Sequence, residues 1–284
     1  MLIDSHCHIF TNRIVENVTA KPQMVKELKL NTEDSVQRLA PKSLQSSAEA
    51  NGVDISLLLP SASPNKVRSE NDRFYQWTLQ FDRIRTLGTL HPTMEDSAAE
   101  VSRLLDLRIQ GFKLSSFSQR FDPLSKESGR MFAEVERLGY RRGVTPTLVF
   151  DTFVRADVYF GAPVEYLTTP YTLGELARRH LGLNIVGAHM GGLLADFDEI
   201  HRHLTPIPNL FLDTANAAHT LTAEQFIELL KIHGAMHILF GTDWPWFIHA
   251  YEIRKIDLLL DRAGYNHTER KAVFGGNAIR LFGL

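Results

Sequence analysis

The segment Ile55-Ser56-Leu57-Leu58-Leu59 is an almost uninterrupted apolar run. Strands that are covered on both faces have this composition, whereas a strand with one wet face alternates apolar and polar residues. Seven further short apolar runs occur along the chain, separated by stretches in which apolar residues recur three or four positions apart. The eight expected strands are Leu2–His8, Ile55–Leu59, Ile84–Leu90, Ile109–Leu114, Thr145–Phe150, Asn184–Ala188, Asn209–Asp213 and His237–Gly241.

Signals for helix starts agree with this alternation. Thr172 is followed three residues later by Glu175, and Thr222 by Gln225, so both pairs predict capping boxes. Eight strands that alternate with helices predict a single α/β domain over residues 1–284, a closed (β/α)8 or TIM barrel. An open doubly wound sheet is the alternative, but its dinucleotide-binding form lacks the Gly-x-Gly-x-x-Gly expected after the first strand.

Two connections, residues 9–33 and 151–171, are longer than most loops in such folds. Loops of this length are usually functional lids or disordered segments. The second contains Phe153, Tyr159 and Phe160, which is too aromatic a composition for a disordered linker. We therefore expect it to be a lid.

Composition limits the classes of function. The chain has 31 Lys and Arg residues against 33 Asp and Glu residues, so no basic excess favours nucleic acid as a partner. Its single cysteine cannot close an internal disulfide. The N-terminus lacks a signal-peptide pattern, and no uncharged run reaches the roughly 18 apolar residues that span a bilayer. These features predict a cytoplasmic protein that acts on a small molecule and binds no membrane.

His6 and His8 lie at the end of the first expected strand. Side chains alternate along a strand, so these two imidazoles share a face and can bind one metal ion, while Cys7 points the other way. The spacing alone is weak evidence, because a second pair, His201 and His203, occurs in a helical stretch where it is expected to lie on the surface. The position at a strand end favours the first pair, since barrel enzymes keep their chemistry there.

His189 and Asp243 follow the sixth and eighth strands in the same way. Each has a simpler alternative, a packed or capping histidine and a turn-capping aspartate. Across a barrel mouth from His6 and His8, however, they are placed as metal ligands and as catalytic acid or base groups.

Three residues are candidates for substrate binding. Lys113 lies inside the apolar fourth strand, where a buried ammonium is unfavourable unless it is paired, so we predict that it binds an anionic group. Neutralisation of a carboxylate of the site, or escape of its ammonium group to solvent, are the alternatives. Asp151 follows the fifth strand, and Trp244 belongs to an aromatic segment near the mouth that would suit a planar substrate.

Five separated motifs resemble, in order, the signatures of the amidohydrolase superfamily, in the branch of aminocarboxymuconate-semialdehyde decarboxylase and related hydrolases and lactonases. The resemblance implies a distorted (β/α)8 barrel, a mononuclear zinc-type site and often a homodimer. The motifs are Ile3-Asp4-Ser5-His6-Cys7-His8-Ile9-Phe10, Gly111-Phe112-Lys113-Leu114, Gly187-Ala188-His189-Met190-Gly191-Gly192, Phe240-Gly241-Thr242-Asp243-Trp244-Pro245 and Gly275-Gly276-Asn277-Ala278-Ile279-Arg280-Leu281-Phe282.

By this resemblance His6 and His8 are the paired metal ligands, Asp243 binds the metal and moves a proton, and His189 is the acid/base group beside it. One position departs from the pattern, because Phe150 stands where the fifth strand usually supplies a ligating histidine. Three outcomes remain open: His189 as the fourth ligand, Asp151 as the fourth ligand, or a site without metal.

The leading hypothesis is a metal-dependent hydrolase, in which activated water attacks an amide or lactone carbonyl of a small carboxylated substrate. The alternatives are a non-oxidative decarboxylase of an aromatic or unsaturated carboxylate, a metal-free lactonase, and a barrel that binds a ligand without catalysis.

Overall fold

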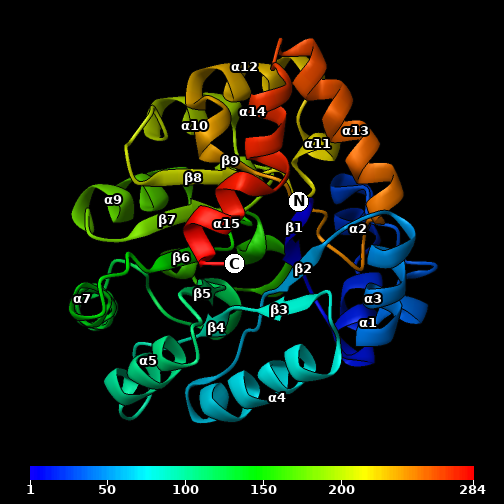
Figure 1. Cartoon of the computed structure of the whole chain (residues 1–284). Coiled ribbons are helices and arrows are strands. Elements are labelled where there is room, and N and C mark those ends of the chain that lie inside the picture. Colours follow the sequence, from blue (N-terminus) through cyan, green and yellow to red (C-terminus); the bar gives the residue numbers. More distant parts are fainter.

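The computed structural model describes residues 1–284 and consists of parallel strands surrounded by helices (Figure 1). Hydrogen bonding joins the strands in the orders β1-β2-β3 and β4-β5-β6-β7-β8-β9. The strands are β1 (Ile3–Cys7), β2 (Ile55–Leu58), β3 (Ile84–Thr86), β4 (Gly88–Thr89), β5 (Gly111–Leu114), β6 (Thr147–Phe150), β7 (Asn184–Gly187), β8 (Leu210–Asp213) and β9 (Ile238–Leu239).

All eight expected strands are confirmed, and the third is divided into β3 and β4. The two sheets join at both seams. The third strand continues from β3 to β4 through Leu87, whose N–H donates to the Leu58 carbonyl oxygen over 2.9 Å; beside β1 and β9, the Ser5 N–H donates to the Phe240 carbonyl oxygen over 2.9 Å. The fold is therefore a (β/α)8 barrel, distorted where the third strand is divided.

The helices form the outer layer of the barrel and its two ends. The α-helices are α1 (Asn12–Thr19), α2 (Pro22–Leu28), α3 (Pro41–Ala50), α4 (Val67–Gln80), α5 (Ser97–Asp106), α6 (Ser116–Gln119), α7 (Lys126–Arg141), α8 (Ala156–Phe160), α9 (Pro170–Arg179), α10 (Phe197–His203), α11 (Ala217–Thr220), α12 (Ala223–His233), α13 (His249–Arg262), α14 (His267–Lys271) and α15 (Asn277–Phe282). Short tighter or wider helical segments are η1 (Ser35–Arg38), η2 (Pro64–Lys66), η3 (Val164–Tyr166), η4 (His189–Gly191), η5 (Ala235–His237) and η6 (Ala272–Gly276). None of the helices combines the length and the apolar character that crossing a lipid bilayer requires.

The two capping predictions had different outcomes. Thr222 and Gln225 form the expected capping box at the start of α12. The box at Thr172 was wrong, because α9 begins three residues earlier than predicted, at Pro170, with Thr169 as its cap. Proline has the backbone φ of a helix and lacks only an N–H that the first turn leaves unpaired, so it favours the earlier start.

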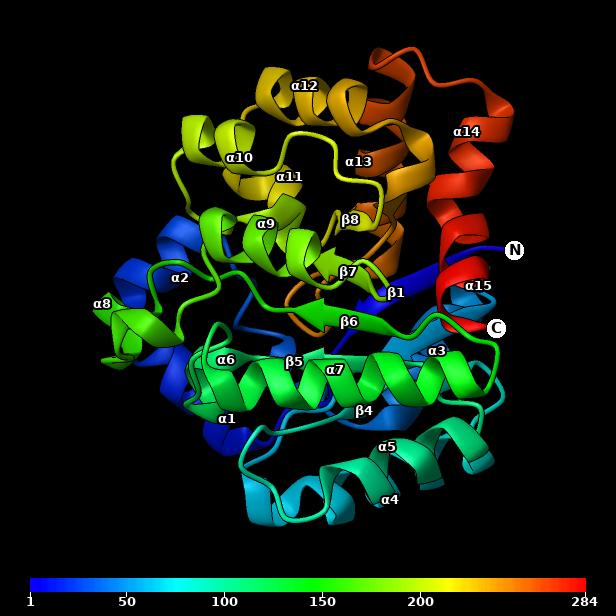
Figure 2. The same cartoon turned by 90° about the vertical axis from the view of Figure 1, so that its left-hand side faces the viewer.

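Alternation along β6 sorts its side chains between two apolar clusters. Leu148 and Phe150 belong to the large cluster between the sheet and the outer helices, whereas Val149 belongs to a smaller inner cluster. The inner cluster also contains Leu281 and Phe282 of α15, which lies at the end of the barrel where the strands begin (Figure 2). The next residue that faces inward from β6 is therefore expected beyond its carboxyl end, at Asp151.

The two long connections fold at the opposite end of the barrel, where α1, α2 and α8 lie (Figure 2). Val15 and Met24 from the first connection share one apolar cluster with Phe153 and Leu167 from the second. We call this pair of connections the mouth cap, residues 9–33 and 151–171. It covers the carboxyl ends of the strands, and its opening as a lid stays a prediction.

Candidate functional site

His6 and His8 meet at the carboxyl end of β1. Their Nε2 atoms lie 3.0 Å apart, and their rings are nearly perpendicular, with centroids 4.9 Å apart. His6 is fully buried and His8 is partly buried. The strand therefore brings both imidazoles to one point, as their alternation predicted.

The other ring nitrogen of each histidine faces an acceptor. His6 Nδ1 lies 2.7 Å from Asp213 Oδ2, and His8 Nδ1 lies 3.3 Å from the carbonyl oxygen of Leu59. Carboxylate and carbonyl oxygens accept, so the Nδ1 atoms donate and both Nε2 atoms present lone pairs. Two lone pairs 3.0 Å apart repel each other unless a cation lies between them.

Asp243 supplies a carboxylate to the same point. Its Oδ1 lies 3.8 Å from His6 Nε2 and 3.7 Å from His8 Nε2. Its backbone N–H donates to the His6 carbonyl oxygen over 3.0 Å, and its φ of +65° turns the chain inward after β9. Two imidazole nitrogens and one carboxylate oxygen are a donor set that suits a divalent ion such as Zn²⁺, so these three residues fit a metal centre.

Burial determines the charge of this group. It lowers the pKa of His6 and of His8 well below the usual value, and the ammonium group of Lys113 lowers both further. Burial raises the pKa of Asp243 well above its usual value, and the carboxylates of Asp151 and Asp213 add to this effect. Both histidines are therefore neutral near pH 7, as metal binding requires.

His189 lies beside this group rather than within it. Its ring centroid is 4.9 Å from that of His6, and its Nδ1 donates to the Ala215 carbonyl oxygen over 2.8 Å. Its Nε2 is 4.0 Å from Asp151 Oδ1. The ring is thus held by one nitrogen and presents the other to the mouth.

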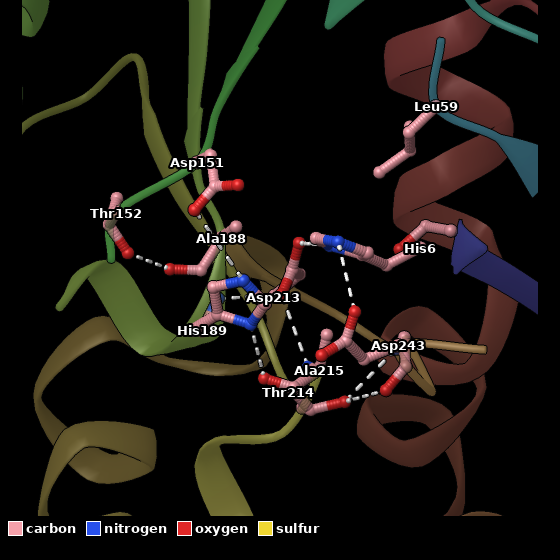
Figure 3. Close-up of polar contacts among 12 residues, drawn as sticks. His6, Leu59, Asp151, Thr152, Ala188, His189, Asp213, Thr214, Ala215 and Asp243 are labelled. Carbon is pink, nitrogen blue, oxygen red and sulfur yellow. Dashed lines mark hydrogen bonds and ion pairs between the residues drawn. The ribbon is translucent and has the colours of Figure 1, made fainter. Parts of the chain in front are cut away.

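Asp213 joins His6 and His189. Figure 3 shows its carboxylate between His6 and His189; one oxygen faces His6 Nδ1, and the other accepts the His189 backbone N–H over 2.9 Å and that of Ala215 over 3.1 Å. Burial raises its pKa to about 6. The sequence marks Asp213 only as a carboxylate at a strand end, and gives no sign of this positioning role.

The structure corrects the expectation for Phe150. Its ring is fully buried and packs edge-on against Phe132 of α7, with centroids 5.8 Å apart, on the outer side of the sheet. The residue that faces the mouth from β6 is Asp151, whose Oδ2 accepts a hydrogen bond from Ser115 Oγ over 3.2 Å. Although burial opposes its ionisation, Lys113 and the histidines lower the pKa of Asp151.

Lys113 contributes a buried positive charge to the same region. Its side chain is 1% exposed, and its Nζ has no hydrogen-bond partner. The ammonium group nevertheless acts on the pKa of His6, His8 and Asp151.

Trp244 does not lie where the sequence placed it. It packs in a separate apolar cluster with Leu44 and Leu58, and its Nε1–H donates to the Arg38 carbonyl oxygen over 3.1 Å. Strand alternation does not extend into the loop after β9, so the prediction that Trp244 contacts substrate is corrected. The aromatic groups nearest the histidines are Phe10, which stacks on His8 with centroids 4.8 Å apart, and Trp246, which packs against Phe10.

A parallel barrel with histidines and an aspartate at the carboxyl ends of its strands has the architecture of a barrel enzyme. The chain belongs to the amidohydrolase family, because a sequence model described as amidohydrolase matches residues 3–284. The resemblance of the five motifs to this superfamily is thereby confirmed, and members of the family are enzymes. No curated protein matches the chain.

Solved structures share the fold over the whole chain. The 5-carboxyvanillate decarboxylase of Sphingomonas paucimobilis is 18% identical, with coverage of 100% and 99% of the two chains and a TM-score of 0.68. An amidohydrolase of Burkholderia multivorans with bound zinc is 18% identical, with the same coverage and a TM-score of 0.67. A probable 2-pyrone-4,6-dicarboxylic acid hydrolase of Acinetobacter baumannii with bound citric acid is 13% identical, again with that coverage and a TM-score of 0.62. At this identity the likeness concerns the fold alone.

Proposed function

We propose that the protein is a metal-dependent hydrolase that acts on an amide or lactone carbonyl of a small carboxylated substrate. One observation carries the proposal: His6, His8 and Asp243 direct three donor atoms to one point at the barrel mouth. These residues would hold the metal, for which we propose Zn²⁺. When bound, such an ion polarises a substrate oxygen and makes a neighbouring water molecule a stronger acid.

Asp243 is the proposed proton carrier. Its pKa is raised well above the usual value by burial and by Asp151 and Asp213, so its carboxylate has a high proton affinity for an aspartate. It can therefore take the proton from the attacking water and return it to the leaving group. No other carboxylate lies within 4 Å of both His6 Nε2 and His8 Nε2.

His189 is the proposed second acid/base group. Because its Nδ1–H is held by the Ala215 carbonyl oxygen, only Nε2 is free to exchange a proton or to face a substrate oxygen. Asp151, 4.0 Å away, would stabilise the protonated ring. His189 would serve as a metal ligand only if its ring turned toward His6.

Lys113 would bind the substrate carboxylate, with Asp151 beside it. A buried ammonium without a hydrogen-bond partner is costly, and an anionic ligand would satisfy it. Lys113→Met should therefore raise KM much more than it lowers kcat, whereas Lys113→Arg should keep part of the affinity.

The decisive experiment is product analysis with a panel of carboxylated lactones and amides in ¹⁸O-labelled water. Hydrolysis should add one labelled oxygen to the product and release no CO2. A matched assay with the Asp243→Asn variant controls for contaminating hydrolases. Release of CO2 with no ¹⁸O in the organic product would overturn the proposal.

A second candidate, non-oxidative decarboxylation of an aromatic carboxylate, rests on the aromatic surroundings of His8. Phe10 stacks on its ring and Trp246 packs against Phe10, so a planar substrate would meet aromatic faces near the histidines. One structural relative is a 5-carboxyvanillate decarboxylase, and 5-carboxyvanillate is an aromatic carboxylate of this type. The same product analysis separates the two reactions.

Four properties complete the proposal: metal dependence, a single domain, a homodimeric state and a cytoplasmic location. Activity should be lost after removal of metal by a chelator and restored by Zn²⁺, whereas full activity of the metal-depleted protein would indicate the metal-free lactonase version. We also propose that residues 1–284 form one domain and that the protein is a homodimer, which light scattering would test. We also propose a cytoplasmic location, which cell fractionation would test.

A further inference from the structure

A second group of donor atoms lies behind the mouth, on the other side of β1. We call Asp4, Cys7 and His249 the back cluster. Their donor atoms all lie within 4.8 Å of one another, and all three residues are fully buried. Asp4 and Cys7 belong to β1, and His249 is the first residue of α13.

The imidazole of His249 is oriented toward this cluster without a hydrogen bond. Its Nε2 lies 3.1 Å from Asp4 Oδ2, but the ring geometry forms no hydrogen bond and this nitrogen has no other partner. Its Nδ1 lies 2.8 Å from Ser47 Oγ. The Ser47 hydroxyl can accept the Nδ1–H, which leaves the Nε2 lone pair directed at the cluster, the arrangement typical of a ligating histidine.

The Asp4 carboxylate retains room for one more contact. Its Oδ1 accepts the backbone N–H groups of His6 and Thr242 over 3.1 and 3.0 Å, and its Oδ2 accepts the Thr242 hydroxyl over 2.5 Å. A carboxylate has about four acceptor positions, and the Cys7 thiol and the His249 ring face the one that remains.

Ser56 supplies another buried oxygen to the cluster. It lies opposite Asp4 in the register of β1 and β2, and its fully buried hydroxyl meets the Cys7 thiol. The unpartnered polar atom of the cluster is His249 Nε2, and a buried nitrogen of this kind calls for a partner.

We propose that the back cluster is a structural zinc site with Asp4, Cys7 and His249 as its three protein ligands. A nitrogen, an oxygen and a sulfur donor within a few ångströms suit Zn²⁺, and the Ser56 hydroxyl or a water molecule would complete the tetrahedron. On binding, the Cys7 S–H bond breaks, its proton passes to solvent and the sulfur lone pair binds the ion. The site has no access for a substrate, which makes it structural and separate from the proposed reaction.

The site would connect elements that carry the mouth residues. The back cluster joins α13 to β1, and Asp4 also holds Thr242, the neighbour of Asp243. An ion at this position would therefore stabilise the segment that places the Asp243 carboxylate opposite His6 and His8.

Cobalt substitution tests the proposal independently of activity, because a thiolate bound to Co²⁺ gives a sulfur-to-metal charge-transfer band in the near ultraviolet. Cys7 is the only cysteine of the chain, so the band can arise only from the back cluster. We expect it in the wild-type protein and in His8→Ala, which alters the mouth, and we expect its loss in Cys7→Ala. His249→Gln should weaken Co²⁺ binding to the back cluster at least tenfold.

Counting of bound metal gives the second readout. The wild-type chain should bind one ion more than Cys7→Ala, whether or not the mouth also holds an ion. A wild-type protein whose cobalt form lacks the sulfur band would overturn the proposal, and so would an unchanged count in a folded Cys7→Ala. If that variant does not fold, Cys7→Ser gives the same comparison, and the wild-type spectrum alone still decides.

Discussion

The chain carries two His-x-His pairs with identical spacing, and they differ in every other respect. His6 and His8 end a strand, and their Nε2 atoms lie 3.0 Å apart inside the barrel mouth. His201 and His203 end α10, where residues two positions apart lie on different sides of the helix. The spacing therefore indicates a metal pair only on a strand, where it brings both rings to one face.

The surroundings of the two pairs differ as well. His201 Nε2 lies 3.8 Å from Glu228 and His203 Nε2 lies 3.1 Å from Glu199, so the exposed ring of His201 and the partly buried ring of His203 each face a carboxylate of their own. At the mouth one carboxylate faces both rings. Both pairs have two histidines and nearby acids. The proposed metal centre differs from the second pair because its two rings share one carboxylate and are more deeply buried.

The largest effect should come from removal of the shared carboxylate. Asn at position 243 has the shape of Asp but cannot carry the proton, so Asp243→Asn should lower kcat by roughly 10³-fold or more. Steady-state kinetics on the substrate found by product analysis measures this. Glu228→Gln beside the exposed pair is the matched control and should leave kcat unchanged. Turnover close to wild type in a folded Asp243→Asn protein would contradict the role of Asp243.

A second effect concerns metal affinity at the two pairs. His8→Ala removes one of three donors and should weaken zinc binding at the mouth by about 100-fold or more, since even outer-shell partners contribute 10- to 100-fold. His203→Ala should change nothing. Titration with Zn²⁺ after chelation measures the zinc affinity of both variants. An equal loss of affinity in His8→Ala and His203→Ala would contradict the distinction between the two pairs.

The pH dependence follows from the same burial. The pKa values of His6 and His8 are lowered well below 6.5, so both rings are unprotonated at pH 7 and remain so as the pH falls somewhat below 6.5. Proton competition at the two rings should therefore set in only at lower pH than at exposed histidines, and a loss of zinc affinity above that range would come from protonation of Asp243, whose pKa is raised. This can be followed in the same titration at a series of pH values.

The sequence predicted the fold and the main site residues because both depend on strands. Continuous apolar runs identify covered parallel strands, and alternation fixes which side chains of a strand share a face. Alternation groups His6 with His8, whereas His189 and Asp243 were added because each follows a strand end and belongs to a family motif; the structure brings all four together at the barrel mouth.

The remaining features depend on the loops and the backbone. The carbonyl groups of Leu59 and Ala215 orient two histidines, but every residue has a carbonyl, so no sequence signal marks these two. Trp244 was misplaced because the positive φ of Asp243 redirects the chain after β9. Phe150 was misassigned by one position, and a shift of one residue on a strand reverses the face.

A smaller change in metal affinity should follow from Asp213→Asn. The amide can no longer accept from His6 Nδ1 with a full charge and can donate instead, so the His6 tautomer that directs a lone pair at the metal is less favoured. We expect zinc affinity at the mouth to fall by about 10- to 100-fold, as for other outer-shell carboxylates. The control is Asp198→Asn, which removes one negative charge in the first turn of α10, the helix that carries His201 and His203. An equal loss of zinc affinity in this variant would mean that the net charge of the protein, and not the contact of Asp213 with His6, causes the effect.

The smallest change in affinity is expected from Phe150→His, although the family pattern would place a ligand there. The ring of Phe150 packs against Phe132 outside the sheet, so an imidazole at this position cannot reach the mouth and zinc affinity should stay the same. Burial of its polar nitrogens should instead lower the free energy of unfolding by about 2–3 kcal/mol, measured by denaturant titration. Asp151→His provides the comparison, because this position does face His189 and a new donor there should strengthen zinc binding. Tighter binding in Phe150→His, with none in Asp151→His, would mean that β6 presents its other face to the site.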